Sequence, residues 1–196
     1  APHVLIRAAL LRYLILGVCN EFRTLPAGIT VIGAGISGQL DLSFTDAPGP
    51  IDFFNCHFAQ RPQMVQLRAD GLAIVKCTLT DGLNAARIQL SGNLTLNRSR
   101  VDGKVSLSGS DIKGHLSCTE AVLRHPDGSA FKAQGMAVAS SVLLEGTIAT
   151  GQVSLLGAQI GGQLVAINVA FHNPTGHALN AQSNREIGRA TCSEKE

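Results

Sequence analysis

Residues Ala27-Gly-Ile-Thr-Val-Ile-Gly-Ala-Gly-Ile-Ser-Gly-Gln-Leu-Asp-Leu42 decide the fold, and they can be interpreted in two ways. Gly33, Gly35 and Gly38 spell G-x-G-x-x-G behind an apolar run, which is the pattern of a dinucleotide-binding turn. The same residues also form the first clear copy of an eleven-residue repeat. The two interpretations predict different folds and different functions.

A dinucleotide site needs glycines that close a strand and open a helix, because amide groups at the helix start bind the pyrophosphate. Residues 29–32 suit the strand, but residues 39–44 alternate like a second strand and Ala47-Pro-Gly-Pro50 prevents a helix. Gly157-Ala-Gln-Ile-Gly-Gly-Gln-Leu164 also repeats the phase of residues 33–40. A repeat explains both copies, whereas a cofactor site explains one, so we favour the repeat.

The repeat has the form G-x-h-x-h-x-x-s-x-h-x, where h is apolar and s is small, and its best copies start at Gly92, Gly103 and Gly151. Positions 3 and 5 alternate with polar residues, as in a short strand with one buried face, and positions 8 and 10 alternate again after a bend. We therefore expect each unit to form two short extended faces with a corner assisted by glycine.

A longer period is also present, because Gly103-Lys-Val-Ser-Leu107 matches Gly151-Gln-Val-Ser-Leu155. Pro126-Asp-Gly-Ser-Ala-Phe-Lys-Ala-Gln134 matches Pro174-Thr-Gly-His-Ala-Leu-Asn-Ala-Gln182 at the same offset. Four units and a short loop account for that offset, although the phase slips between residues 65 and 81. Two units per turn give about 22 residues per coil. The sequence thus predicts an all-β fold, a right-handed parallel β-helix (solenoid) over residues 27–183.

The segment before the repeat is predicted to cap it. Residues 3–18 follow a helical pattern with Val4, Ala8, Leu11 and Ile15 on one face, so residues 1–26 are expected to be a capping α-helix and linker. The helix is too short and too charged to cross a bilayer. Attachment to a membrane surface is a second interpretation, which we do not favour.

The segment after the repeat, residues 184–196, is polar and loses the pattern. It is expected to be a disordered tail, or the point at which the array is cut short. An uncapped last coil would leave strand edges that can pair with another chain. A homodimer through an end coil or sheet edge is therefore one predicted assembly.

Composition limits the compartment and the partners. Charged residues are 15% of the 196 residues and glycine contributes 21, which is typical of a solenoid of small and aliphatic residues. The net charge of +2 comes without a Lys/Arg-rich run, so we expect no nucleic-acid partner. The five cysteines are widely spaced, which argues against a disulfide framework or zinc site and favours a reducing, cytoplasmic location. Cys56 and Cys118 fall at inward positions.

A resemblance to a known family covers about residues 3–183. The residues that carry it are Arg7-Ala8, Leu11-Arg12, Gly33-Ala-Gly-Ile-Ser-Gly-Gln-Leu-Asp-Leu42, Asn55-Cys56, Gly157-Ala-Gln-Ile-Gly-Gly-Gln-Leu164 and Asn173-Pro-Thr-Gly-His-Ala-Leu179. In these residues the chain resembles pentapeptide-repeat-like β-helix proteins. It is similar to a group of bacterial repeat proteins often labelled membrane-associated oxidoreductases. The resemblance implies a parallel β-helix and brings no catalytic residues with it.

One group of polar residues is a candidate binding edge, because the proline loops near residues 60–64, 125–128 and 173–176 should stack. Its members are Arg61, Arg124, His125, Asp127 and His172. They predict either a strip that binds an anionic ligand or partner, or simply solvated loop side chains. No catalytic, cofactor or metal-binding set can be assigned by spacing.

The favoured hypothesis is therefore a non-enzymatic binding or assembly module with an unknown protein partner, acting through a flat sheet face, the loop edge or an open end. The alternatives are an NAD- or FAD-linked oxidoreductase that uses residues 33–38 and a peripheral membrane protein.

Overall fold

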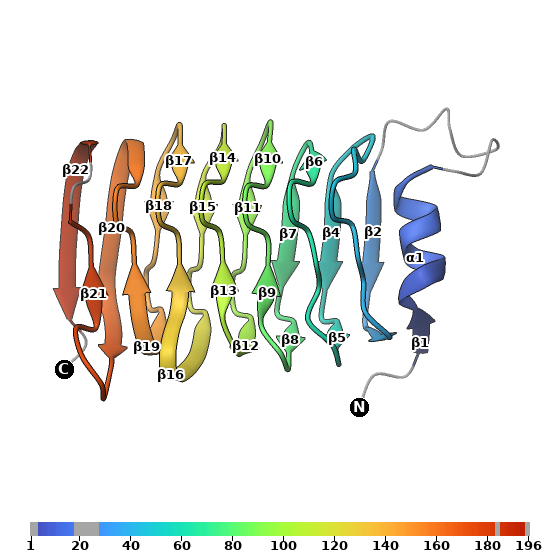
Figure 1. The fold of residues 1–196 in the computed structure, drawn as a ribbon, viewed down its shortest axis with the longest axis horizontal. Helices are drawn as coiled ribbons and strands as arrows, with labels where there is room; N and C mark the ends of the chain where they lie inside the picture. Colours follow the sequence, from blue (N-terminus) through green and yellow to red (C-terminus); the bar gives the residue numbers. More distant parts are fainter. Residues whose placement is uncertain (1–3, 18–27, 183–184, 195–196) are drawn as a thin grey trace.

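Short parallel strands stacked along one axis form a β-solenoid of about seven coils, with one short helix near its N-terminal end (Figure 1). The structure is a computed structural model that describes residues 4–17, 28–182 and 185–194. Its strands pair in parallel with about 22 residues per coil. The predicted all-β parallel solenoid is confirmed.

Each coil has four extended faces, two from each eleven-residue unit, and equivalent strands stack into columns. The first face contains β1 (Val4–Arg7), β3 (Ala34–Ser37), β5 (His57–Phe58), β8 (Thr78–Leu79), β12 (Arg100–Asp102), and parts of β16 (Val122–Lys132), β19 (Ile148–Ser154) and β20 (Gln159–His172). The second face contains β9 (Leu83–Asn84), β13 (Val105–Ser106), β21 (Leu179–Asn180) and the ends of β16 and β19.

The other two faces complete the coil. The third, which we call the groove face, contains β6 (Arg68–Ala69), β10 (Gln89–Leu90), β14 (Asp111–Ile112), β17 (Ala137–Val138) and the start of β20. The fourth contains β2 (Ile29–Ile32), β4 (Ile51–Phe54), β7 (Leu72–Val75), β11 (Leu94–Thr95), β15 (Leu116–Ser117), β18 (Val142–Leu143) and the middle of β20.

Strand register shows that some coils are longer than the ordinary coil. Arg100 pairs with Val122, one ordinary coil further along the chain, whereas Val122 pairs with Ile148, which lies four residues beyond the ordinary spacing. The four extra residues lie where the register of β16 shifts, three between Arg124 and Ser129 and one between Ser129 and Phe131. A long coil followed by an ordinary one produces the longer period of the sequence.

One coil is a residue short, which explains the phase slip in the sequence. Arg68 pairs with Gln89 and Ile51 pairs with Leu72, and each partner comes one residue earlier than in an ordinary coil. Leu72 follows Arg68 by four residues, whereas the equivalent residues of the other coils are five residues apart. The missing residue is therefore at the corner after Asp70. The strands on either side keep their inward and outward alternation.

The N-terminal helix is shorter than the sequence predicts. α1 spans Ala8–Ile15, and the residues before it form β1, which pairs with β3. Leu11 and Ile15 are buried against the core as expected, but Val4 is 58% exposed and does not share their face. The backbone of β1 bonds to the edge of β3, and a helical turn there would leave that edge unpaired. No helix in the described part of the chain is long and apolar enough to cross a membrane.

The C-terminal segment that the sequence places outside the array contains β22 (Arg185–Glu194). This strand pairs in parallel with β20, with Leu164 opposite Ala190. Strand pairing uses backbone groups, so it continues although the repeat pattern does not. The predicted linker, residues 18–26, lies outside the described residues.

Each eleven-residue unit turns a corner at position 7 with a backbone in the left-handed region. Arg98 has φ 57°, and the amide of Ser99 donates to the carbonyl of Leu96 across 3.2 Å. A turn of this kind needs positive φ at its third residue, where glycine and asparagine are favoured. One corner column is Gly33, Asn55, Lys76, Arg98, Glu120, Gly146 and Asn168, and the other is Phe44, Gln66, Arg87, Gly109, Gly135 and Gly157.

The predicted role of glycine at position 1 differs from this. At Gly92 a β-carbon would lie 2.6 Å from the carbonyl oxygen of Asp70 in the preceding coil. Glycine there permits a close approach of two backbones, and at Gly103 and Gly151 it also adopts a positive φ, 118° and 112°, in addition to the left-handed residue at position 7.

Small polar side chains at position 8 join neighbouring coils at the corner. The hydroxyl of Ser99 donates to the carbonyl of Ile74 (2.8 Å) and accepts from the amide of Cys77 (3.0 Å). The thiol of Cys77 makes the same kind of contact one coil earlier, with the carbonyl of Phe53 and the amide of Cys56. These side chains pair buried backbone groups that would otherwise lack partners.

The core is a set of inward columns, as the repeat predicts. In the unit that starts at Gly92, positions 3, 5, 8 and 10 are all buried to 1% exposure or less. The rings of Phe53 and Phe58 meet edge to face with their centroids 5.0 Å apart. Cys56 and Cys118 are buried free thiols, also as predicted.

We predict that Ser99→Ala lowers the free energy of unfolding by about 1–3 kcal/mol, because it leaves a buried amide and a buried carbonyl without a hydrogen-bond partner. Ser99→Cys should recover most of the loss, since cysteine fills the equivalent corner at Cys77. Urea unfolding followed by circular dichroism measures both. Equal losses for the two variants would show that volume, rather than hydrogen bonding, sets the effect.

Candidate functional site

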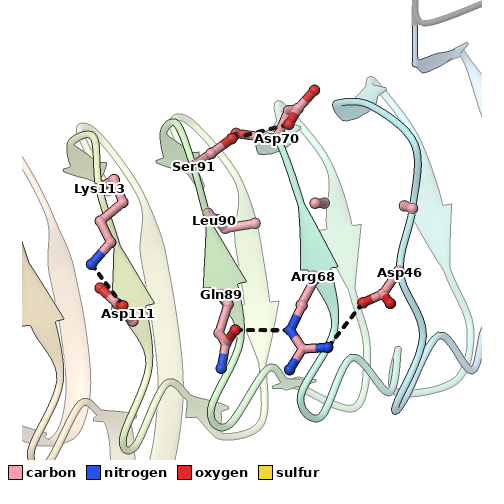
Figure 2. Close-up of a pocket in the computed structure, with 10 residues that line it drawn as sticks. Asp46, Arg68, Asp70, Gln89, Leu90, Ser91, Asp111 and Lys113 are labelled. Carbon is pink, nitrogen blue, oxygen red and sulfur yellow. Dashed lines mark hydrogen bonds and ion pairs between the residues drawn. The ribbon is translucent and has the colours of Figure 1, made fainter.

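A chain of shallow hollows runs along the groove face and crosses the coils from end to end. The largest has a volume of about 370 Å³ and is lined by residues 46–47, 68–70, 89–91, Asp111 and Lys113 (Figure 2). A hollow of about 260 Å³ shares Asp46, Arg68 and Gln89 with it on one side. A third, of about 200 Å³, shares Asp111 and Lys113 on the other and ends at Gly161. Together these surfaces form what we call the groove.

The groove follows from register rather than from any local motif. On each strand of the groove face one side chain points into the core and its neighbours point outward, as Leu90 does between Gln89 and Ser91. The outward neighbours of successive coils therefore stand in two parallel rows. Neighbouring strands lie about 4.8 Å apart, so the rows present a side chain at that interval along the axis.

Polar contacts link neighbouring coils within each row. The Nε of Arg68 donates to the Oε1 of Gln89 over 2.9 Å, and its Nη1 lies 3.4 Å from the Oδ1 of Asp46 (Figure 2). Beside them Ser91 donates to the carboxylate of Asp70 over 3.0 Å. These contacts fix the directions of the groove side chains while leaving much of their surface in solvent.

The charges of the groove nearly balance. It carries the carboxylates of Asp46, Asp70 and Asp111 and the cations of Arg68 and Lys113. The ammonium of Lys113 lies 2.8 Å from the carboxylate of Asp111. Because these groups are well exposed, each pair adds little to stability. They offer donors and acceptors in alternation, which suits a polar ligand without a strong charge of its own.

Phe44 stands at the N-terminal end of the groove and is 72% exposed. Its φ of 58° is shared by Gln66 (54°) and Arg87 (56°) at the same corner of the next two coils, so the left-handed backbone belongs to the corner and not to Phe44 alone. What distinguishes Phe44 is an exposed aromatic ring with no evident packing role, which is available for contact with a ligand.

The predicted polar edge lies elsewhere, at the corner between the first and second faces. Arg124 pairs in register with Thr150, which pairs with His172, so these two predicted residues are two coils apart, about 10 Å along the axis. His125 and Asp127 fall in the bulge of β16. Arg61 lies further along the same corner and bonds to Asp81, at 2.6 Å to its carbonyl.

These five residues lie along one corner of the solenoid. Within the described residues no hydrogen bond or ion pair joins any two of them. Five coils separate Arg61 from His172, so the set is spread along the axis rather than gathered around one point.

The glycine motif forms a corner and a strand. Gly33 has φ 70° between β2 and β3, and its amide donates to the carbonyl of Phe54 in the next coil over 2.8 Å. Gly35 lies within β3, which pairs with β1 and β5. The described chain therefore continues from the motif as a strand, and the amide groups that would bind a pyrophosphate at a helix start are used between coils.

The titratable groups of the core are poor candidates for chemistry. Burial raises the pKa of Cys118 to about 12, so its thiol stays protonated at neutral pH. A hydrogen bond with Cys56, together with burial, raises the pKa of Cys77. Cys56 itself is only 2% exposed, which keeps its sulfur out of reach of a substrate. Among the described residues no three His, Cys, Asp or Glu side chains gather closely enough to hold a metal ion.

A second hollow, of about 270 Å³, lies between α1 and the corner at residues 47–51. Leu14, Ile15 and Ile29 contribute to walls that carry no charged side chain. Residues 18–27 lie outside the described residues. The groove is therefore the candidate site.

No protein-family model, curated protein or solved structure matches the chain.

Sequence reasoning misses the groove, although a signal for it exists. The members of its first row recur at intervals of one coil, from Asp46 to Arg68 to Gln89 to Asp111. The short coil moves Gln89 one place out of the regular spacing, and outward positions vary in residue type. A search for polar residues at coil spacing, rather than at loops, would have found the row.

We predict that Phe44→Asn keeps or raises the free energy of unfolding, by up to about 1 kcal/mol, because asparagine tolerates the left-handed region better than phenylalanine. Thermal or urea unfolding of the two proteins measures the change. A clear loss of stability would mean that the Phe44 ring packs on the solenoid, and its exposure would then have no functional meaning.

Proposed function

We propose that the protein is a non-enzymatic binding module that holds an extended polar ligand along the groove. We also place the solenoid among the pentapeptide-repeat-like β-helices, a proposal that rests on the sequence resemblance and on the corner at every eleventh residue. The observation that carries the functional proposal is the continuity of the groove, whose three hollows share lining residues from Phe44 to Gly161.

The shape of the groove favours an elongated ligand over a compact one. Each hollow is open to solvent and shallow, and the pockets of drug-sized ligands are usually enclosed clefts of roughly 300–1,000 Å³. A ligand in contact with several coils gains from many weak, similar contacts. The rigid solenoid supplies these at fixed intervals, so little ordering of the protein accompanies binding.

The proposal is tested with three soluble polymers of different charge: heparin, poly-L-lysine and dextran. Binding to the full chain is measured by affinity electrophoresis for the wild type, Arg68→Ala and Arg98→Ala. Arg98 is a matched control because it is similarly exposed and bonds to Glu120 over 2.9 Å, away from the groove. We expect at least one polymer to bind the wild type and Arg98→Ala alike.

If that polymer is heparin or dextran, Arg68→Ala should weaken binding several-fold, because it removes the central donor of the groove. If it is poly-L-lysine, the same variant should strengthen binding, because it removes a cation that repels the polymer. Binding of none of the three polymers would overturn the proposal, as would equal losses for the two arginine variants.

Self-association is a second candidate function, favoured by the N-terminal edge. β1 pairs with β3 and is the first strand of the array, and its Val4 and Leu5 are 58% and 74% exposed. An exposed apolar edge strand is a template for pairing with another chain. Antiparallel pairing of β1 with β1 of a second copy would satisfy both edges around a twofold axis.

We expect the full chain to be a dimer by size-exclusion chromatography with light scattering at micromolar concentrations. Leu5→Lys should convert it to a monomer by placing like charges at the shared edge, whereas Ile148→Lys, at an exposed apolar position in the middle of the array, should not. A wild-type monomer, or a dimer that persists in Leu5→Lys, would contradict pairing through β1.

A further inference from the structure

We propose that Phe44, Asp46, Gln66, Arg68 and Gln89 form a subsite for one sugar ring of an uncharged oligosaccharide that lies along the groove. This inference rests on the proposed function and names the class of ligand. The five residues line one hollow of about 260 Å³, which continues into the largest hollow of the groove.

The aromatic ring supplies the apolar part of the recognition. A sugar ring has one face made largely of C–H groups, which packs well on the face of an aromatic side chain. Phe44 is 72% exposed and lines the hollow. Aromatic packing contributes beyond the apolar area that it buries. Gln66 occupies the equivalent position of the next coil, so the Phe44 ring and the Gln66 side-chain amide are one coil apart.

The polar side chains supply the other part. A sugar hydroxyl both donates and accepts hydrogen bonds, so it needs acceptors and donors side by side. The carboxylate of Asp46 accepts, the guanidinium of Arg68 donates, and the amides of Gln66 and Gln89 can do either. Because Arg68 is held by Gln89 at 2.9 Å and lies near Asp46, the donors are oriented before the ligand arrives.

Charge and size narrow the ligand further. A polyanion such as nucleic acid gains its affinity from a run of cations, whereas the groove carries three carboxylates beside its two cations. A polycation would meet Arg68 and Lys113. The hollow of about 260 Å³ is smaller than typical pockets for drug-sized ligands, so it suits a single ring rather than a dinucleotide.

The test uses the full chain and three uncharged hexasaccharides: cellohexaose, maltohexaose and chitohexaose. Binding is followed by two-dimensional NMR titration for the wild type, Phe44→Asn, Phe44→Tyr and Ile32→Asn. Ile32 is the matched control, because it is a large apolar side chain of similar exposure, 69%, that does not line the groove.

We expect saturable binding of at least one hexasaccharide, with shifts confined to the groove face. Phe44→Asn should weaken that binding about tenfold, since an aromatic contact is worth on the order of 1 kcal/mol or more. Phe44→Tyr should keep it within a few-fold, and Ile32→Asn should leave it unchanged. Circular dichroism of each variant confirms that it is folded.

Two results would overturn the inference: no saturable binding of any hexasaccharide at millimolar concentration, or binding that Phe44→Asn leaves intact. If heparin binds through Arg68 while no hexasaccharide does, the sugar subsite is wrong and the groove remains a binding site for another ligand. If no polymer and no hexasaccharide binds, both proposals fall together.

Discussion

Hydrogen bonds between the backbones of successive coils are the interaction on which this structure depends. The amide of Leu94 donates to the carbonyl of His115 over 2.9 Å, and equivalent bonds recur in coil after coil. They require each coil to follow the path of its neighbours, so each must turn its corners at the same places. The left-handed residue of each corner, such as Arg98, and the small polar side chains that join the coils at some corners, such as Ser99, are consequences of that requirement.

The sequence predicts the parts of the fold that this constraint makes periodic. Inward positions such as Leu94 and Leu96 alternate visibly, and the coil of about 22 residues follows from them. Prediction from sequence fails where one local feature of the backbone decides the structure. The periodicity of residues 4–7 suits a helix, yet these residues form a strand that pairs with the open edge of β3. One missing residue after Asp70 shifts the phase without changing the fold.

The candidate site could not be predicted in the same way, because the repeat does not constrain outward side chains. Packing restricts Leu90 but leaves Gln89 and Ser91 free to vary, so the row shows in the sequence only as polar residues at coil spacing, without a repeated residue type. The predicted edge relied on charged residues beside proline loops, and the structure spreads these along a corner. The groove joins residues such as Asp46 and Asp111, which come together only once the lengths of the intervening coils are known.

The two longer coils have a consequence for how such a chain can lengthen. Val105 pairs with Phe131 across a long coil, Phe131 with Val153 across an ordinary one, and Val153 with Leu179 across a long one again. A long coil and an ordinary coil together thus make a block that ends in register with its own beginning. Tandem duplication of such a block adds whole coils, so it would extend the inward columns and the outer rows without any new fold. Substitutions in the outer rows of the new copy could then diversify while the interior stayed the same.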